Sequence, residues 1–242
     1  IGPVRSTRLM FNDLATHYDT IVAHAGGSNY VLNNARELGV EGFNIDTWDS
    51  TDYSFRDKTR TQNHYTWEHV LFARGEGLEA KAEEEGFRTT INPDIDYRLR
   101  FQPDGTPENG EDASRIDLVL TFHNSKKDCG FVYEPEVGRY VYWQYGKEMH
   151  DGLTDEKETY DNVIVMFPTD IHIVNSGYQV ANFEDGGDGY YASGGKVIPI
   201  KWGCDDAHSP FWFTTQDGEE LVMTQGRTFI AITEVGSQIT WE

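Results

Sequence analysis

The strongest constraint on the fold is a unit near the start of the chain in which helical and strand patterns alternate. Ser6 can cap a helix whose apolar residues recur at roughly helical spacing as far as Tyr18. The apolar run at 20–24 predicts a short strand that is covered on both faces. The Gly-Gly-Ser turn at 26–28 precedes a second helix, which Gly39 is suited to end. This order predicts an α/β layer.

Strand patterns dominate from Arg115 onward. The runs at 116–122, 130–134 and 139–145 are separated by turn residues, and they predict an antiparallel meander. The nearly all-apolar run at 162–167 predicts a central strand, because a strand covered on both faces carries apolar residues in succession.

The last part of the chain is spaced like a small all-β unit, with runs at 196–202, 211–214, 220–223 and 228–232. We therefore expect a mixed fold of the α/β and α+β kind. It would contain a helix-flanked mixed sheet, then the antiparallel meander, then the smaller C-terminal all-β unit. The expected domains are residues 1–187 and residues 188–242.

Several residues of the first unit are suited to bind an anion. A strand that delivers a Gly-Gly-Ser turn to a helix N-terminus presents free N–H groups, and Ser28 lies at this point. His24 is expected at the carboxyl end of the strand, where open α/β sheets tend to place ligands. Arg5 and Arg8 lie three residues apart, so both guanidiniums could hold one carboxylate or phosphate. Salt bridges to the chain's many carboxylates are the alternative role for both arginines.

Histidines form a second set of candidates. His150 is followed by Asp151, which could orient the imidazole ring for acid/base catalysis, and His64 is a further candidate for proton transfer. Two histidines and a carboxylate could instead hold a metal, although the chain has no His-x-x-x-His or His-Glu-x-x-His spacing. Each could also be a hydrogen-bonded structural histidine at the end of an element. The sequence leaves these alternatives open, and we predict no metal and no other cofactor.

Short motifs along the chain carry a resemblance to a known family. They are Gly-Pro-Val-Arg-Ser-Thr-Arg at 2–8, His-Ala-Gly-Gly-Ser at 24–28, Arg56-Asp57, Asn-His-Tyr-Thr at 63–66 and His150-Asp151. In this order they resemble the YerB-like family of bacterial proteins described as lipoproteins, a domain of unknown function. The runs at 193–202 and 226–230 are similar to the smaller C-terminal domain of that family.

The resemblance implies a location at the extracellular face of the cell membrane, reached through a lipid anchor, and it implies no established activity. Family members usually begin with a leader and a lipid-attachment cysteine, which this sequence lacks. We therefore expect the chain to be a trimmed piece of such a protein. Trp143 stands where an arginine is common in the family, which leaves the role of that position open.

Charge and composition exclude some partners. The formal net charge is −21 at pH 7, so the chain would repel nucleic acid and anionic membrane surfaces. No apolar run approaches the roughly 18 residues that a membrane span needs. Cys129 and Cys204 could form one disulfide or remain two separate thiols, and the sequence also leaves the oligomeric state open.

These observations predict one site, for which we consider three functions. The leading hypothesis is a module that binds an anionic envelope or extracellular small molecule. A hydrolase or transferase is the first alternative, in which histidines transfer protons and arginines stabilise negative charge. An envelope scaffold without a ligand is the second alternative. The candidate ligand-binding residues are Arg5, Arg8, His24, Ser28, Arg56 and His64, and the candidate catalytic residues are His64, His150 and Asp151.

Overall fold

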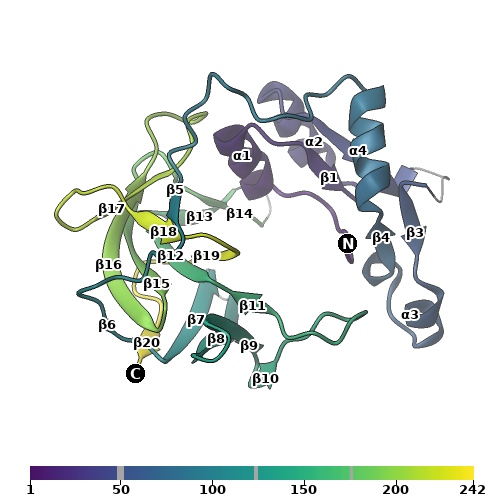
Figure 1. Ribbon diagram of the computed structural model, residues 1–242. Coiled ribbons are helices and arrows are strands. Elements are labelled where there is room, and N and C mark those ends of the chain that lie inside the picture. Colours follow the sequence, from purple (N-terminus) through teal and green to yellow (C-terminus); the bar gives the residue numbers. More distant parts are fainter. Residues whose placement is uncertain (48–51, 123–124, 175–176) are drawn as a thin grey trace. The chain divides into compact units, whose positions relative to one another are not determined.

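The computed structural model of the chain describes residues 1–47, 52–122, 125–174 and 177–242 (Figure 1). The fold is mixed, with few helices and many strands in several sheets, as the alternating patterns predict. The chain divides into two compact units. The first unit contains residues 1–96 and 207–209, and the second contains residues 97–206 and 210–242.

The first unit begins with the predicted alternation of helix and strand. Its first elements are α1 (Leu9–Tyr18), β1 (Val22–His24), α2 (Asn29–Glu37) and β2 (Gly42–Asn44), and β1 pairs with β2 in parallel. Ser28 caps α2, because its side chain accepts a hydrogen bond from Val31 N–H. Gly39 follows α2 with a φ of 71°, a left-handed conformation that glycine adopts without strain.

The start of α1 differs from the prediction that Ser6 caps this helix. Arg8 is the N-cap residue, and its side chain makes no capping hydrogen bond. Ser6 Oγ instead donates a hydrogen bond to Ala25 O at 3.1 Å. The hydroxyl is therefore used to hold two extended segments together rather than to begin a helix.

Shorter elements complete the first unit: η1 (Ile45–Thr47), β3 (Ser54–Arg56), α3 (Lys58–Gln62), η2 (Trp67–His69), β4 (Leu71–Ala73) and α4 (Gly75–Glu84), where η marks a 3₁₀ turn. β3 and β4 pair in an antiparallel hairpin. Asp57 caps α3 by accepting hydrogen bonds from Thr59 N–H and Arg60 N–H.

The first seven residues join the two halves of this unit. On one side, Val4 N–H donates a hydrogen bond to Leu71 O in β4 at 2.8 Å. On the other side, Thr7 N–H donates to Gly26 O, just beyond β1, at 3.0 Å. The segment 1–7 therefore lies between β4 and the turn after β1, and it makes backbone hydrogen bonds to both.

The second unit is built from strands: β5 (Arg100–Gln102), β6 (Glu111–Asp112), β7 (Arg115–Phe122), β8 (Ser125–Glu134), β9 (Arg139–Gln144), β10 (Lys147–Glu148), β11 (Thr159–Tyr160), β12 (Asn162–Pro168), β13 (Ile171–Val174), β14 (Tyr178–Ala181), β15 (Gly187–Ser193), β16 (Lys196–Gly203), β17 (Trp212–Thr215), β18 (Val222–Thr224), β19 (Thr228–Ile232) and β20 (Ile239–Trp241). One sheet has the order β10–β9–β8–β7–β20, with β11 beside β9. The other has the order β17–β16–β15–β12–β19, with β6 beside β16. β7, β8 and β9 pair antiparallel, as the meander pattern predicts.

The structure places the division between the two parts of the chain elsewhere than the sequence does. The expected boundary between residues 187 and 188 falls within β15, which pairs antiparallel with both β12 and β16. β19 pairs with β12 in parallel, so the later strands share a sheet with the predicted central strand. They do not form a separate small unit, because their backbone hydrogen bonds are made to β12 and β15.

The core of the second unit is formed by residues from both of its larger sheets. Phe131 and Tyr142 come from the meander, and Phe229 comes from β19. The ring centroids of Phe131 and Phe229 lie 5.0 Å apart in an edge-to-face contact. Tyr140 and Tyr142 are also buried, so β9 supplies aromatic residues to this core.

Across the described ranges, none of the helices combines the length and the apolar composition needed to cross a bilayer.

Candidate functional site

A cavity of about 620 Å³ lies in the first unit between α1, the N-terminal segment and β1. It is lined by Pro3, Val4, Arg5, Ser6, Thr7, Phe11, Leu14, Ala15, Tyr18, Thr20, Ile21, Val22, Ala23 and His24. We call it the α1 cavity. Its volume falls within the range of small-molecule sites, which are concave, largely apolar and equipped with a few polar groups.

One wall of the α1 cavity is an apolar face of α1. Phe11, Leu14 and Tyr18 follow one another at helical spacing, so their side chains share this face. The Phe11 side chain is 53% exposed, which is a large solvent contact for an aromatic residue. A ligand that covered it would remove apolar surface from water, and this would favour binding.

Among the described residues that line this cavity, Arg5 alone carries a formal charge. Its side chain is exposed, and one guanidinium nitrogen lies 3.5 Å from Nε2 of His69. In a chain with a net charge of −21, a single arginine at an apolar cavity provides a local positive charge. It would attract one carboxylate or phosphate group.

His24 contributes an uncharged polar group to the same cavity. Its Nδ1 lies 2.9 Å from Gly26 O, so Nδ1 carries the proton and Nε2 is left as an acceptor. Burial lowers the pKa of His24, because the charged imidazolium loses water contacts, and the hydrogen bond to Gly26 opposes this only in part. The ring is therefore neutral at pH 7, and Arg5 alone sets the charge of the site.

A buried polar network fixes α1 against its neighbours. Asn12 is 1% exposed, and its Nδ2 donates to Val31 O at 3.0 Å and to Asn34 Oδ1 at 2.8 Å. Thr7 Oγ1 donates to Asn12 Oδ1 at 3.2 Å. Sequence reasoning missed this network, although an asparagine among the apolar residues of a short helix was an available signal for it. The network ties the N-terminal segment, α1 and α2 together, and so shapes the α1 cavity.

Arg8 does not join Arg5 at the cavity. Its guanidinium donates hydrogen bonds to the backbone oxygens of Ser6 and Thr7, at 3.1 and 2.8 Å. It is not among the lining residues of the α1 cavity. The predicted fork of two arginines on one anion is therefore not formed in this arrangement.

The Gly-Gly-Ser turn is also committed to internal hydrogen bonds. Gly26 N–H donates to Asn44 Oδ1 at 2.8 Å, and Val31 N–H donates to Ser28 Oγ at 3.3 Å. Two N–H groups of the turn and of the helix start thus already have acceptors. Ser28 lies at the predicted position but acts as a helix cap there.

Arg56 and His64 come from the β3–α3 region and do not line the α1 cavity. Arg56 forms an ion pair with Asp46 and donates to Trp67 O at 2.9 Å. Its Cζ lies 3.5 Å from the centroid of the Trp67 ring, in cation–π contact. His64 is exposed and has a φ of 62°, where the chain turns after α3.

His150 and Asp151 belong to the second unit, and their hydrogen bonds brace the connection between β10 and β11. His150 Nδ1 lies 2.8 Å from Asp155 O, and Nε2 lies 2.7 Å from Glu148 Oε1. These two contacts raise the pKa of His150, because both stabilise the charged ring. Asp151 Oδ1 accepts the N–H groups of Leu153 and Thr154 rather than a histidine proton. With both nitrogens engaged, the ring has no free position for a substrate in this arrangement.

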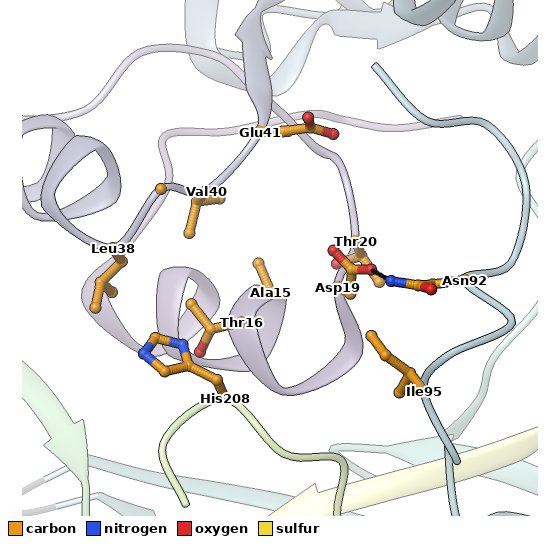
Figure 2. Close-up of a pocket in the computed structure, with 11 residues that line it drawn as sticks. Ala15, Thr16, Asp19, Thr20, Leu38, Val40, Glu41, Asn92, Ile95 and His208 are labelled. Atoms are coloured by element: carbon orange, nitrogen blue, oxygen red, sulfur yellow. Dashed lines mark hydrogen bonds between the residues drawn. The ribbon is translucent and has the colours of Figure 1, made fainter.

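A second cavity, of about 290 Å³, is lined by the end of α1, by residues 38–41 and by Asn92, Ile95 and His208 (Figure 2). The carboxylates of Asp19 and Glu41 border it, which makes it unsuitable for an anion. Asp19 accepts hydrogen bonds from Arg88 and from Asn92 Nδ2, as the dashed line in Figure 2 shows for the latter. Of these two cavities, the α1 cavity is therefore the better candidate for an anionic ligand.

The part of the chain that the structure describes contains neither a metal-binding cluster nor a reactive thiol. There, no group of three or more histidine, cysteine, aspartate and glutamate side chains is arranged to hold a metal ion. Cys129 and Cys204 are both free thiols, which resolves the question of a disulfide. Burial raises the pKa of each to about 11, so neither is a reactive thiolate at neutral pH.

Comparison with known proteins identifies the family to which the chain belongs. The N-terminal domain of a protein family of unknown function (DUF3048) matches residues 1–88, and the C-terminal domain of the same family matches residues 118–230. The chain belongs to this YerB-like family, as its motifs predict.

A relative from Bacillus subtilis (strain 168), described as "Putative lipoprotein YerB", is 23% identical to the chain over 235 residues. The match covers 96% of this chain but 66% of the relative, so the chain spans slightly less than two thirds of that protein. The crystal structure of the YerB protein from Bacillus subtilis is similar, with a TM-score of 0.80 and 22% identity over 99% of this chain and 77% of the other. At this identity the likeness establishes the fold alone.

Proposed function

We propose that the first unit binds a small molecule that carries one anionic group on an apolar body. The observation that supports this is the α1 cavity, in which one cation, Arg5, lies beside an otherwise uncharged and largely apolar lining. The anionic group would be bound by the guanidinium of Arg5. The apolar part would cover Phe11, Leu14 and Tyr18.

The single positive charge of the α1 cavity limits the kinds of ligand that would fit it. Phosphorylated sugars and polyphosphates carry several charges and little apolar surface, so they would leave the apolar wall exposed. An apolar carboxylate or an alkyl phosphate satisfies both features of the cavity. A hydrolase or transferase has less support, because both ring nitrogens of His150 are engaged and His64 does not line the cavity.

We further propose that the ligand is met at the outer face of a cell membrane. This part of the proposal is supported by the description of the Bacillus subtilis relative as a lipoprotein, since a lipoprotein is held at a membrane by its lipid. The ligand would then be an envelope or extracellular compound.

Thermal unfolding with matched ligand pairs tests the binding proposal. Octanoate is expected to raise the melting temperature, whereas octanamide, which has the same chain but no charge, has little effect. Arg5→Gln should weaken octanoate binding by about tenfold to a hundredfold, because it removes a charge-assisted hydrogen bond. Arg8→Gln is the matched control, since Arg8 contacts only nearby backbone oxygens in the described contacts. Equal stabilisation by octanamide, or equal losses in both variants, would contradict the proposal, and no shift with any apolar anion would favour a scaffold.

A further inference from the structure

A third cavity, of about 260 Å³, lies in the first unit where β1, α2 and β2 follow one another along the chain. We call it the β1–β2 cavity. His24 and Asn44 line it, and they are the last residues of the two strands and are paired with each other. In open sheets of parallel strands, ligands bind beyond the carboxyl ends of the strands. The cavity therefore lies at a position typical of a binding site.

The asparagines and the threonine of the lining are engaged in hydrogen bonds within the protein. Thr7 Oγ1 donates to Asn12 Oδ1 at 3.2 Å, and Asn12 Nδ2 donates twice to residues of α2. Asn44 Oδ1 accepts the N–H groups of Gly26 at 2.8 Å and of Asp46 at 3.1 Å. Because these bonds join the N-terminal segment, α1, α2 and the strand ends, they hold the walls of the cavity in place.

His24 differs from these side chains because one of its ring nitrogens remains available. Nδ1 donates to Gly26 O at 2.9 Å, and burial lowers the pKa of the ring, so the imidazole is neutral at pH 7. Nε2 therefore carries a lone pair, and the residues that the structure describes make no hydrogen bond to this atom. It can accept one hydrogen bond from a ligand.

Arg36 is the cation of the β1–β2 cavity, since it alone of the described lining residues carries a formal charge. It is exposed, and its Nη1 donates to Asn33 Oδ1, a neutral acceptor, at 2.6 Å. No carboxylate pairs with Arg36 in the described part of the chain, although acidic residues outnumber basic ones by 41 to 20. Its remaining N–H groups can therefore bind a carboxylate of a ligand.

The end of α2, which lies at this cavity, does not present bare carbonyl oxygens to an anion. A helix C-terminus is negative because its last carbonyl groups lack partners. Here the carbonyl oxygens of Asn34, Ala35 and Arg36 accept N–H groups of residues 38–40. The repulsion that an anion would meet beside Arg36 is reduced accordingly.

The rest of the lining is apolar, and the cavity is small. Val22, Leu32, Ala35 and Val40 provide the apolar surface. The volume of about 260 Å³ lies slightly below the range of about 300–1,000 Å³ that is typical of sites for drug-sized ligands. The occupant must therefore be a short molecule.

We propose that the β1–β2 cavity binds a short aliphatic hydroxycarboxylate. Its carboxylate would bind Arg36, its hydroxyl would donate to His24 Nε2, and its carbon chain would contact the apolar lining. An amino acid would fit less well, because none of the described lining residues carries a carboxylate that could pair with its ammonium group. The proposal does not rest on the function proposed above, since Arg36 lines this cavity and Arg5 lines the α1 cavity.

Nuclear magnetic resonance titration of the full chain tests this proposal, because it reports both the affinity and the place of binding. The probes are pentanoate, its monohydroxylated isomers and the corresponding aminopentanoates. At least one hydroxypentanoate is expected to bind about tenfold more tightly than pentanoate, because its hydroxyl satisfies Nε2 of His24. The amide signals of Arg36 and Asn44 should shift, whereas those of Phe11 and Leu14, which line the α1 cavity, should not.

Two variants and one control separate the two contacts. Arg36→Gln should weaken binding of the hydroxypentanoate by about tenfold or more, because it removes the charge-assisted hydrogen bonds. His24→Asn keeps a donor near Gly26 O but has no counterpart of Nε2, so it should bind the hydroxypentanoate and pentanoate equally. Lys126→Gln, which removes one charge from an exposed position on β8, should bind as the unmodified chain does. The dispersion of amide signals confirms that each variant is folded, and Arg36→Gln remains a test should His24→Asn fail to fold.

Several results would overturn the proposal. They are absence of binding, equal binding of pentanoate and all its hydroxylated isomers, tighter binding of an aminopentanoate, and unchanged binding by Arg36→Gln. Shifts confined to Phe11 and Leu14 would also overturn it, because the acid would then occupy the α1 cavity. Conversely, a failure of octanoate to bind while a hydroxypentanoate shifts Arg36 and Asn44 would contradict only the function proposed above.

Discussion

Asn162 in β12 offers the sharpest test of how the second unit is held together. The side chain is fully buried, and both of its polar atoms are satisfied. Its Nδ2 donates to Thr224 O at 2.8 Å and to Thr228 Oγ1 at 3.1 Å. Its Oδ1 accepts from Tyr191 Oη at 2.8 Å and from Thr224 N–H at 3.1 Å. One amide thus connects β12 to β15, β18 and β19.

The substitution Asn162→Asp keeps the shape of this side chain and changes only its chemistry. A carboxylate cannot donate to Thr224 O, and a buried charge without a cation is strongly disfavoured. The folded protein should therefore hold the introduced carboxyl group protonated, whereas the unfolded chain ionises it with a pKa near 3.9. At pH 7, about three units above that value, the cost of keeping the proton is about 4 kcal/mol. Because the folded pKa is raised, this cost grows as the pH rises and nearly disappears below about pH 4.

Urea unfolding at about pH 4.5 and about pH 7.5, followed by tryptophan fluorescence, measures this cost against the unmodified chain. Asn109→Asp is the matched control, because Asn109 is exposed in a turn and its ionisation should change stability little. A loss for Asn162→Asp that is equal at both pH values, or below about 1 kcal/mol at the higher one, would refute the reasoning.

Two further substitutions test local features of the two units by the same unfolding assay. Gly226 has a φ of 142°, and a Cβ there would lie 2.1 Å from Asp161 Oδ2, so Gly226→Ala should cost about 3 kcal/mol. Gly138→Ala also has a positive φ but open space around the new atom, and a loss as large as that of Gly226→Ala would contradict the steric argument. Burial raises the pKa of Asp13 from 3.8 to about 6, so its ionisation opposes folding and stability falls as the pH rises from about 4 to about 6. After allowance for solvent screening, Asp13→Asn should add about 1–2 kcal/mol at neutral pH and nothing below about pH 4, and a loss at neutral pH would contradict this sign.

Local patterns predicted the elements that depend on neighbours in sequence. The start of the first unit has its helices and strands where apolar spacing, the Ser28 cap and Gly39 place them. The alternation from Arg115 onward predicted β7, β8 and β9 and their antiparallel pairing. In each case the residues that determine the element lie within it or next to it, so the element can be predicted from a single sequence.

Such local patterns do not predict which strands far apart in the sequence pair with each other. The expected domain boundary near residue 187 followed a glycine-rich stretch, but Gly187 begins a strand that is paired on both sides. Glycine is used there because Phe167 O lies close to the position that a Cβ would occupy, at 2.2 Å. A close approach between strands and a flexible linker both favour glycine, so composition alone does not distinguish them.

In the candidate site, too, local sequence patterns predicted some positions but not the contacts between distant residues. Sequence reasoning placed Arg5 and His24 together, and they share the α1 cavity. It could not predict that Arg56 would be paired with Asp46, since the partner is fixed by the course of the chain through η1 and β3. It also missed the apolar wall of α1, because the face of a helix that borders a cavity has the same spacing as one that borders the core.

The position of the N-terminal segment has a consequence for synthesis of the protein. Residues 1–7 hydrogen bond to β4 as well as to the turn after β1, and β4 ends more than sixty residues later in the chain, at Ala73. As the chain leaves the ribosome from its N-terminus, α1, β1 and α2 emerge before the strand that holds the other side of this segment. The hydrogen bonds of the first residues to β4 must therefore wait until β4 has been made. The α1 cavity, which residues 3–7 help to line, is therefore held on that side only after β4 has joined the N-terminal segment.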